Sequence, residues 1–108
     1  MALRQPTKGT YAEMSAAGST QADAAEVSAD YIMVTSLTEL TADGVLLPPG
    51  NLGDEVVIVN GTGTANLKIY PRSGGKINNV VANGALEIAP NTAAHFIGIN
   101  SLNWAAFF

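Results

Sequence analysis

The sequence predicts an all-β protein, a small antiparallel sandwich or barrel formed by residues 30–108 and preceded by an extended N-terminal arm, residues 1–29. Three observations predict this fold. Short runs rich in β-branched and aromatic residues recur every ~8–12 residues after residue 30. Gly, Pro and Asn cluster between these runs, as they do in turns. No helical periodicity longer than two turns occurs there. The length of 108 residues suits one β-domain.

The arm is distinguished by its composition, which is dominated by Ala, Ser, Thr and Gln. Such a segment cannot bury enough apolar area by itself to offset the entropy lost on ordering. Its alanines permit a short helix over residues 20–29. That helix would place three acids on roughly one face: Asp23, Glu26 and Asp30. A flexible tail and an arm that becomes ordered against a partner both remain open, and in the second case we expect Tyr11 and Met14 to contact the partner.

The β-domain contains eight runs that we expect to form strands. They are residues 31–36, 45–47, 55–60, 65–71, 76–78, 85–89, 92–99 and 102–108. Residues 55–60 (EVVIVN) are almost wholly apolar, which suggests burial on both faces or at a subunit contact. In the next run Leu67 and Ile69 share one face. The first run ends at Asn60-Gly61, a pair typical of tight turns, and the glycine-rich stretch of residues 61–64 (GTGT) leads into the second run. We therefore expect the two runs to form a hairpin.

Asparagine is unusually frequent where charges are scarce, with nine asparagines after residue 50. Asn tolerates turn conformations and hydrogen-bonds to the backbone, so most of these residues are expected in turns. Their excess over charged residues also fits a surface that is covered in an assembly, because interface cores are depleted of charge. This composition predicts a homo-oligomer or a docked partner.

Composition and charge exclude several classes of function. The chain has no cysteine, which excludes a disulfide scaffold, a thiolate metal site and a cysteine nucleophile. The net charge of −4 argues against general nucleic-acid binding, which needs clustered cations, and Lys68, Arg72 and Lys76 are too few. No run approaches the ~20 apolar residues of a membrane span, and no signal peptide is visible. We therefore expect neither nucleic acid nor membrane as a partner, and synthesis in the cytoplasm.

Residues suited to catalysis do not form a recognisable constellation. His95 is the only histidine, which excludes a pair of histidine ligands, and it lies mid-strand, where we expect it to face solvent or a subunit seam. No serine stands in a G-x-S-x-G motif. Asp54 and Glu55 are neighbours in a strand and so point to opposite faces. We predict that the chain is not an enzyme and has no catalytic residue, metal ligand or cofactor.

Aromatic residues offer a different kind of site. Tyr70, Arg72 and Trp104 could form a sugar-stacking or cation–π platform, because aromatic faces suit the apolar faces of sugars. The apolar neighbours of Trp104 favour the alternative that it anchors the core. Phe107 and Phe108 would be an aggregation hazard if exposed, so we expect them to pack into the domain or an adjacent subunit.

A longer pattern unites these elements over roughly residues 45–107. A Pro-rich turn precedes an apolar strand that ends in Asn, and the segment Tyr70–Asn78 reads Tyr-Pro-x-x-Gly-Gly-x-Ile-Asn. An alternating strand at Leu86–Ile88 follows, then a strand containing Phe96 and a Trp near the end, Trp104. This pattern resembles small β-modules in virion proteins of tailed bacteriophages.

The resemblance implies a structural role and transfers no catalytic residues. Such modules are capsid decoration (cement) proteins or the heads of virion fibres, and they are often trimeric. We therefore expect a homotrimeric decoration protein in the virion, which binds the major capsid protein and stabilises the assembled head. The N-terminal arm would spread over neighbouring capsid subunits and fold on contact. The alternative is a receptor- or glycan-binding module of a fibre or tail.

Overall fold

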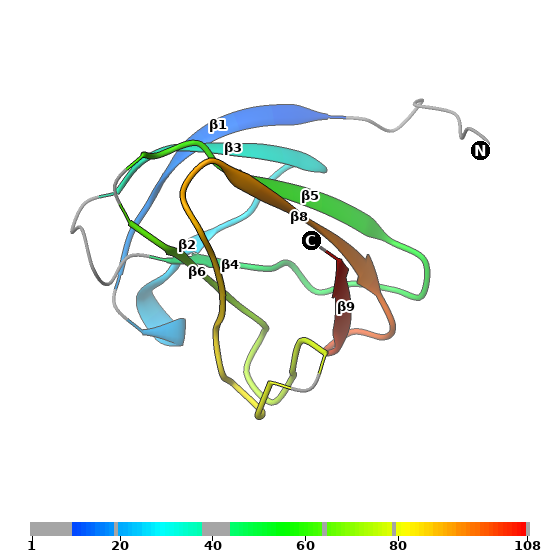
Figure 1. Cartoon of the computed structure of the whole chain (residues 1–108). Helices are drawn as coiled ribbons and strands as arrows, with labels where there is room; N and C mark the ends of the chain where they lie inside the picture. Colours follow the sequence, from blue (N-terminus) through cyan, green and yellow to red (C-terminus); the bar gives the residue numbers. More distant parts are fainter. Residues whose placement is uncertain (1–9, 19, 38–43, 64, 79, 108) are drawn as a thin grey trace.

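Two β-sheets pack face to face in the computed structural model of the protein (Figure 1). The structure describes residues 10–18, 20–37, 44–63, 65–78 and 80–107. Within these residues there is no α-helix and no closed barrel. The expected all-β fold is confirmed, and of the two expected architectures the sandwich is the one observed.

The larger sheet has five strands, and all but the last of them lie across the upper part of Figure 1. In spatial order the strands are β1 (Tyr11–Ala16), β3 (Tyr31–Leu37), β5 (Glu55–Asn60), β8 (Thr92–Gly98) and β9 (Trp104–Phe107). The first three strands are mutually parallel, whereas β5, β8 and β9 are antiparallel neighbours.

The smaller sheet has four strands. In order they are β2 (Ala25–Glu26), β4 (Gly44–Leu46), β6 (Leu67–Tyr70) and β7 (Leu86–Ile88). Here β2, β4 and β6 are parallel and β7 is antiparallel to β6. Both sheets are therefore mixed, and the expectation of an antiparallel sandwich is wrong. From β1 to β6 the chain alternates between the sheets, so each strand returns to its own sheet in the same direction through a crossover, as parallel pairing requires.

The predicted hairpin between residues 55–60 and 65–71 is wrong for the same reason, because β5 and β6 belong to different sheets. Asn60 explains the local geometry. Its fully buried amide nitrogen donates to the carbonyls of Ala65 and Ile88, at 2.9 and 3.2 Å. Its side-chain oxygen accepts hydrogen bonds from the backbone and hydroxyl of Thr62. The side chain thus stabilises an arch between the sheets where a tight turn was expected.

Most other expected strands match the structure, except that residues 76–78 contribute only an isolated bridge between Ile77 and Trp104. The turn role of asparagine is also confirmed at several positions. Asn78, Asn83 and Asn91 have positive φ, in the left-handed region that asparagine tolerates.

Residues 10–29 differ from the arm that their composition predicts. They supply β1 to the five-stranded sheet and β2 to the four-stranded sheet, and they bury Ala16 and Val27 in the core. The helix expected over residues 20–29 is absent; only a 3-10 turn, η2 (Gln21–Asp23), occurs there. The segment packs through small residues, whose weak hydrophobic signal concealed an alternating strand pattern. The remainder of the expected arm, residues 1–9, lies outside the described residues.

The core lies between the two sheets. Its fully buried members from the five-stranded sheet include Ile32, Val34, Ile58, Phe96 and Trp104, and those from the four-stranded sheet include Val45, Leu67, Ile69 and Ile88. Burial of each large apolar side chain contributes about 1.5–3 kcal/mol. Within the described residues the inner faces are thus fully used, and any site must lie at the edges or on the outer faces.

Candidate interaction surface

The structure separates the residues expected to form a sugar-binding platform. Trp104 is 1% exposed and belongs to the core between the sheets. Tyr70 is also buried, but in a second cluster with Ala24 and Leu46. The two rings therefore lie in different clusters, and neither offers an open face on which a sugar could stack. This burial agrees with the alternative that Trp104 anchors the core.

Arg72, the third member of that platform, has a partner within the chain. Its guanidinium lies 3.6 Å from the carboxylate of Glu26, at the end of β2. The arginine side chain is half-buried, and its Nε atom is buried without a hydrogen bond. This position suits a link between the β2 edge and the segment that follows β6 better than contact with a ligand.

Tyr11 and Met14, expected to contact a partner, lie on opposite faces of β1. Met14 packs against the core and is only partly accessible. Tyr11 points outward, with 62% of its surface exposed, and its hydroxyl donates a hydrogen bond to Glu13 at 3.0 Å. That hydrogen bond, partial desolvation and the carboxylate charge raise the pKa of Tyr11 above its ordinary value. Only Tyr11 is therefore placed to meet another protein.

Tyr11 belongs to a broad apolar surface, which we call the outer five-strand face. Its central band comprises twelve outward-pointing residues of the five-stranded sheet: Tyr11, Glu13, Tyr31, Met33, Glu55, Val57, Val59, Ala93, His95, Ile97, Ala105 and Phe107. Nine of the twelve are apolar or aromatic. The exposed hydroxyl residues Ser15, Thr35 and Ser36 continue the face toward the ends of β1 and β3. No described element covers this face, which lies along the upper side of the sandwich in Figure 1.

Most polar groups on the outer five-strand face have partners within the chain. His95 Nε2 lies 3.4 Å from a carboxylate oxygen of Glu55, and both side chains are about two-fifths exposed. The contact is an ion pair when the imidazole is protonated, although its geometry does not make a hydrogen bond. His95 thus points outward, as expected, and beside it the ring of Phe107 lies at a centroid distance of 6.5 Å.

Phe107 is 58% exposed, so within the described chain it does not pack into the domain. Packing of Phe107 against an adjacent subunit stays a prediction, and Phe108 lies outside the described residues. Sequence reasoning did not single out Tyr31 or Met33 for this surface. The available signal was that the strand beginning at Tyr31 carries large apolar residues at outward as well as inward positions.

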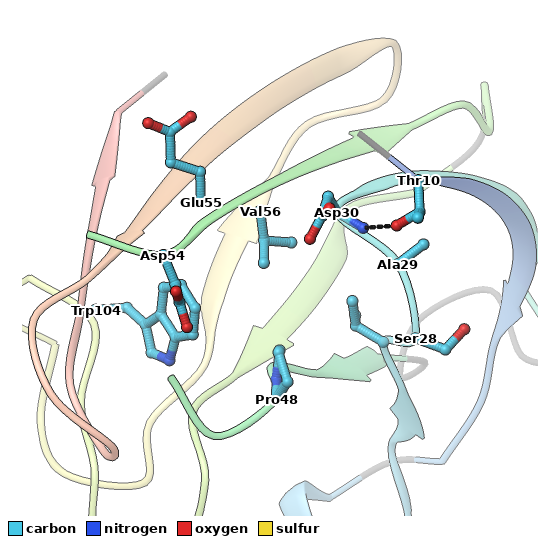
Figure 2. A pocket seen from close by; sticks show the side chains of 10 residues that line it. Thr10, Ser28, Ala29, Asp30, Pro48, Asp54, Glu55, Val56 and Trp104 are labelled. Carbon is cyan, nitrogen blue, oxygen red and sulfur yellow. Dashed lines mark hydrogen bonds between the residues drawn. The ribbon is translucent and has the colours of Figure 1, made fainter. Parts of the chain in front are cut away.

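A pocket of about 300 Å³ opens at one end of the sandwich (Figure 2). Its lining includes Asp30, Pro48, Asp54, Val56 and Trp104. Asp54 directly precedes β5 and Glu55 begins it, and their carboxylates lie on different sides of the ribbon in Figure 2, as expected for neighbours in extended chain. Asp54 accepts a hydrogen bond from the backbone of Asn51, at 2.9 Å.

The chemistry of this pocket is limited. His95 is not among its lining residues; it contacts Glu55, whose carboxylate points away from that of Asp54 in Figure 2, so His95 and the two acids do not converge on one point of the pocket. Nowhere in the described part of the chain do three or more acids and histidines form a group that could hold a metal ion. The same residues include no helix long and apolar enough to span a membrane.

Comparison with known proteins identifies no relative: no family model, curated protein or solved structure matches the chain. The outer five-strand face is therefore the feature from which a function is argued.

Proposed function

We propose that the chain is a structural protein of a phage virion, a decoration protein that binds and stabilises the assembled head. The observation that carries this proposal is the outer five-strand face. The largest apolar patch on a protein surface is often functional, and an apolar patch with polar residues around it is typical of a contact with another protein. The virion class and the major capsid protein as partner come from the sequence resemblance.

The mechanism is a linkage between binding and assembly. A protein that binds the assembled shell and not its free subunits adds its binding free energy to the stability of the shell. Multiple copies on adjacent sites strengthen attachment further, because each bound contact raises the effective concentration for the next. Neither step requires a catalytic residue, a metal or a cofactor. The resemblance implies a homotrimer, which a mass measurement in solution distinguishes from the two-fold dimer proposed below.

The alternative, a receptor- or glycan-binding module, loses the site on which it depended. The burial of Tyr70 and Trp104 removes their rings from the surface, and Arg72 is paired with Glu26. No other described feature favours a sugar over a protein partner.

The direct test uses empty heads assembled from the major capsid protein encoded with this chain. We expect the chain to sediment with the heads, to saturate at a fixed stoichiometry and to raise their disassembly temperature. Free capsid subunits serve as the control and should bind weakly. Failure to sediment with heads at any tested concentration would contradict the decoration function. Deletion of residues 1–28 is not a suitable test, because it removes β1 and β2 from the two sheets.

A further inference from the structure

One row of side chains crosses the entire outer five-strand face. Tyr11, Tyr31, Val57, His95 and Phe107 are direct register partners on five neighbouring strands. The row therefore runs perpendicular to the strands and carries four rings and one valine. Tyr11, Tyr31 and Phe107 are respectively 62%, 47% and 58% exposed, so the row stands open to solvent in the single chain.

We propose that this face packs against the same face of a second copy of the chain, around a two-fold axis that runs along the row. Such an axis places each row residue against its own counterpart. It also aligns the strands of the two sheets, which is a standard arrangement for sheets packed about 10 Å apart. The contact is isologous and closes as a dimer.

The charges on the face are compatible with this arrangement. Because β1, β3 and β5 are parallel, Glu13 and Glu55 lie on opposite sides of the row. The two-fold axis brings Glu13 of one copy to the side of Glu55 of the other, two strand spacings away, or about 10 Å laterally. The acids of the two copies are thus kept apart.

Most polar groups that a second copy would cover already have partners, although His95 Nε2 makes no hydrogen bond. The Tyr11 hydroxyl is bound to Glu13 and the carboxylate of Glu55 adjoins His95. Unpaired buried polar groups are the main cost of covering a surface, so partners within the chain reduce that cost. The face carries no Lys or Arg, which argues against an acidic partner.

The area of the face is sufficient for a stable contact. Five strands spaced at ~4.8 Å give a width of about 24 Å, and the outward residues with their side chains extend about 20 Å along the strands. The face then measures on the order of 500 Å² in projection, so two copies together reach the ~1,000 Å² expected of a specific interface.

This inference rests on the proposed structural role, in which the face contacts protein, and it assigns that contact to a second copy of the chain rather than to the capsid protein. It is tested without capsid shells. The full chain is analysed by sedimentation equilibrium at about 100 µM, where a contact with micromolar Kd is filled. We expect twice the chain mass of 11.1 kDa. Val57→Lys should weaken dimerisation by more than about tenfold, because the interface would bury an unpaired ammonium group.

The matched control is Val81→Lys, the same substitution at a residue that is 74% exposed and lies outside the face. It should dimerise like the unmodified chain. Circular dichroism verifies that each variant is folded. Because Val57 is half-buried, Phe107→Lys provides a second variant at an exposed position of the same row.

The possible outcomes separate this inference from the proposed function. A monomer, a trimer, or a dimer insensitive to both face variants overturns the two-fold contact. A monomer that still binds heads, but loses binding on Val57→Lys, assigns the face to the capsid protein and keeps the decoration function. A dimer that is disrupted by the face variants and ignores heads supports the two-fold contact and contradicts the decoration function.

Discussion

The two sheets of the sandwich share a core but present opposite kinds of surface. On the outer side of the four-stranded sheet, Lys68 is directly opposite Glu87, and Arg72 pairs with Glu26. Opposite charges on facing strands favour sheet pairing and remain compatible with water. The outer five-strand face, by contrast, is mostly apolar and includes no Lys or Arg.

The two sheets also differ in whether other parts of the chain cover the apolar residues on their outer sides. Apolar residues on the outer side of the four-stranded sheet are covered by the chain itself: Ala24, just after η2, packs with Leu46 and Tyr70. The Gln21 amide then donates to the backbone oxygen of Pro71 at 2.6 Å. No described segment does the same for Tyr31 or Phe107. The apolar residues on the outer side of the four-stranded sheet are thus covered within the chain, whereas the outer five-strand face is suited to contact with another protein.

The largest effect expected is the contrast between the two faces of β9. Trp104→Ala removes a fully buried ring from the core and should lower the free energy of unfolding by about 3–5 kcal/mol. Phe107→Ala, on the same strand, changes an exposed ring and should cost less than about 1 kcal/mol in dilute solution. Urea unfolding followed by circular dichroism measures both. Equal stability of the two variants would contradict the assigned inner and outer faces.

A smaller effect is expected at the arch between the sheets. Asn60→Ala leaves the carbonyls of Ala65 and Ile88 and the amide of Thr62 without their partner. Unsatisfied buried groups cost about 1–3 kcal/mol each, so we expect a total loss of about 2–4 kcal/mol after local relaxation. Asn66→Ala is the control, because Asn66 is exposed and its side-chain hydrogen bond within the described residues is to the exposed Glu87 side chain. An unaffected unfolding midpoint for Asn60→Ala would show that the arch does not depend on this side chain.

The sequence was sufficient to predict the strands whose residues carry a strong signal. The β-branched and aromatic content of residues 31–36 and 55–60 predicted β3 and β5. The two-sided apolar pattern of residues 55–60 suggested burial on both faces or a subunit contact, and the second alternative stays a prediction. β1 and β2 were missed because alanine gives little contrast between inward and outward positions.

The sheet partners could not be predicted from local patterns. Asn60-Gly61 favours a hairpin locally, but the buried hydrogen bonds of Asn60 stabilise a crossing between the sheets. The candidate surface depends on the same long-range information. Tyr11 and Phe107 are almost a hundred residues apart, and only the register of three intervening strands places them in one row. Composition suggested that some surface was covered, but not which one.

The smallest effect expected concerns the ionisation of Tyr11, at one end of that row. Its hydrogen bond to Glu13 favours the neutral phenol, and this raises its pKa above the ordinary value of 10.0. Glu13→Gln removes the carboxylate charge and should lower the pKa of Tyr11, as measured by residue-resolved NMR titration. Because the folded-state pKa is raised, any stability linked to this group is present below pH 10 and is lost as the phenol ionises above it.

The same titration distinguishes a covered face from an open one. If a second copy covers Tyr11, loss of water from around the hydroxyl disfavours the phenolate and raises its pKa further. The pKa of Tyr11 should then increase with protein concentration in the unmodified chain and in Val81→Lys, but remain constant in Val57→Lys. A pKa that is independent of concentration in all three proteins, although the unmodified chain dimerises, would place the dimer contact away from Tyr11. The self-contact would then have to lie outside the outer five-strand face or reach only its β8–β9 half.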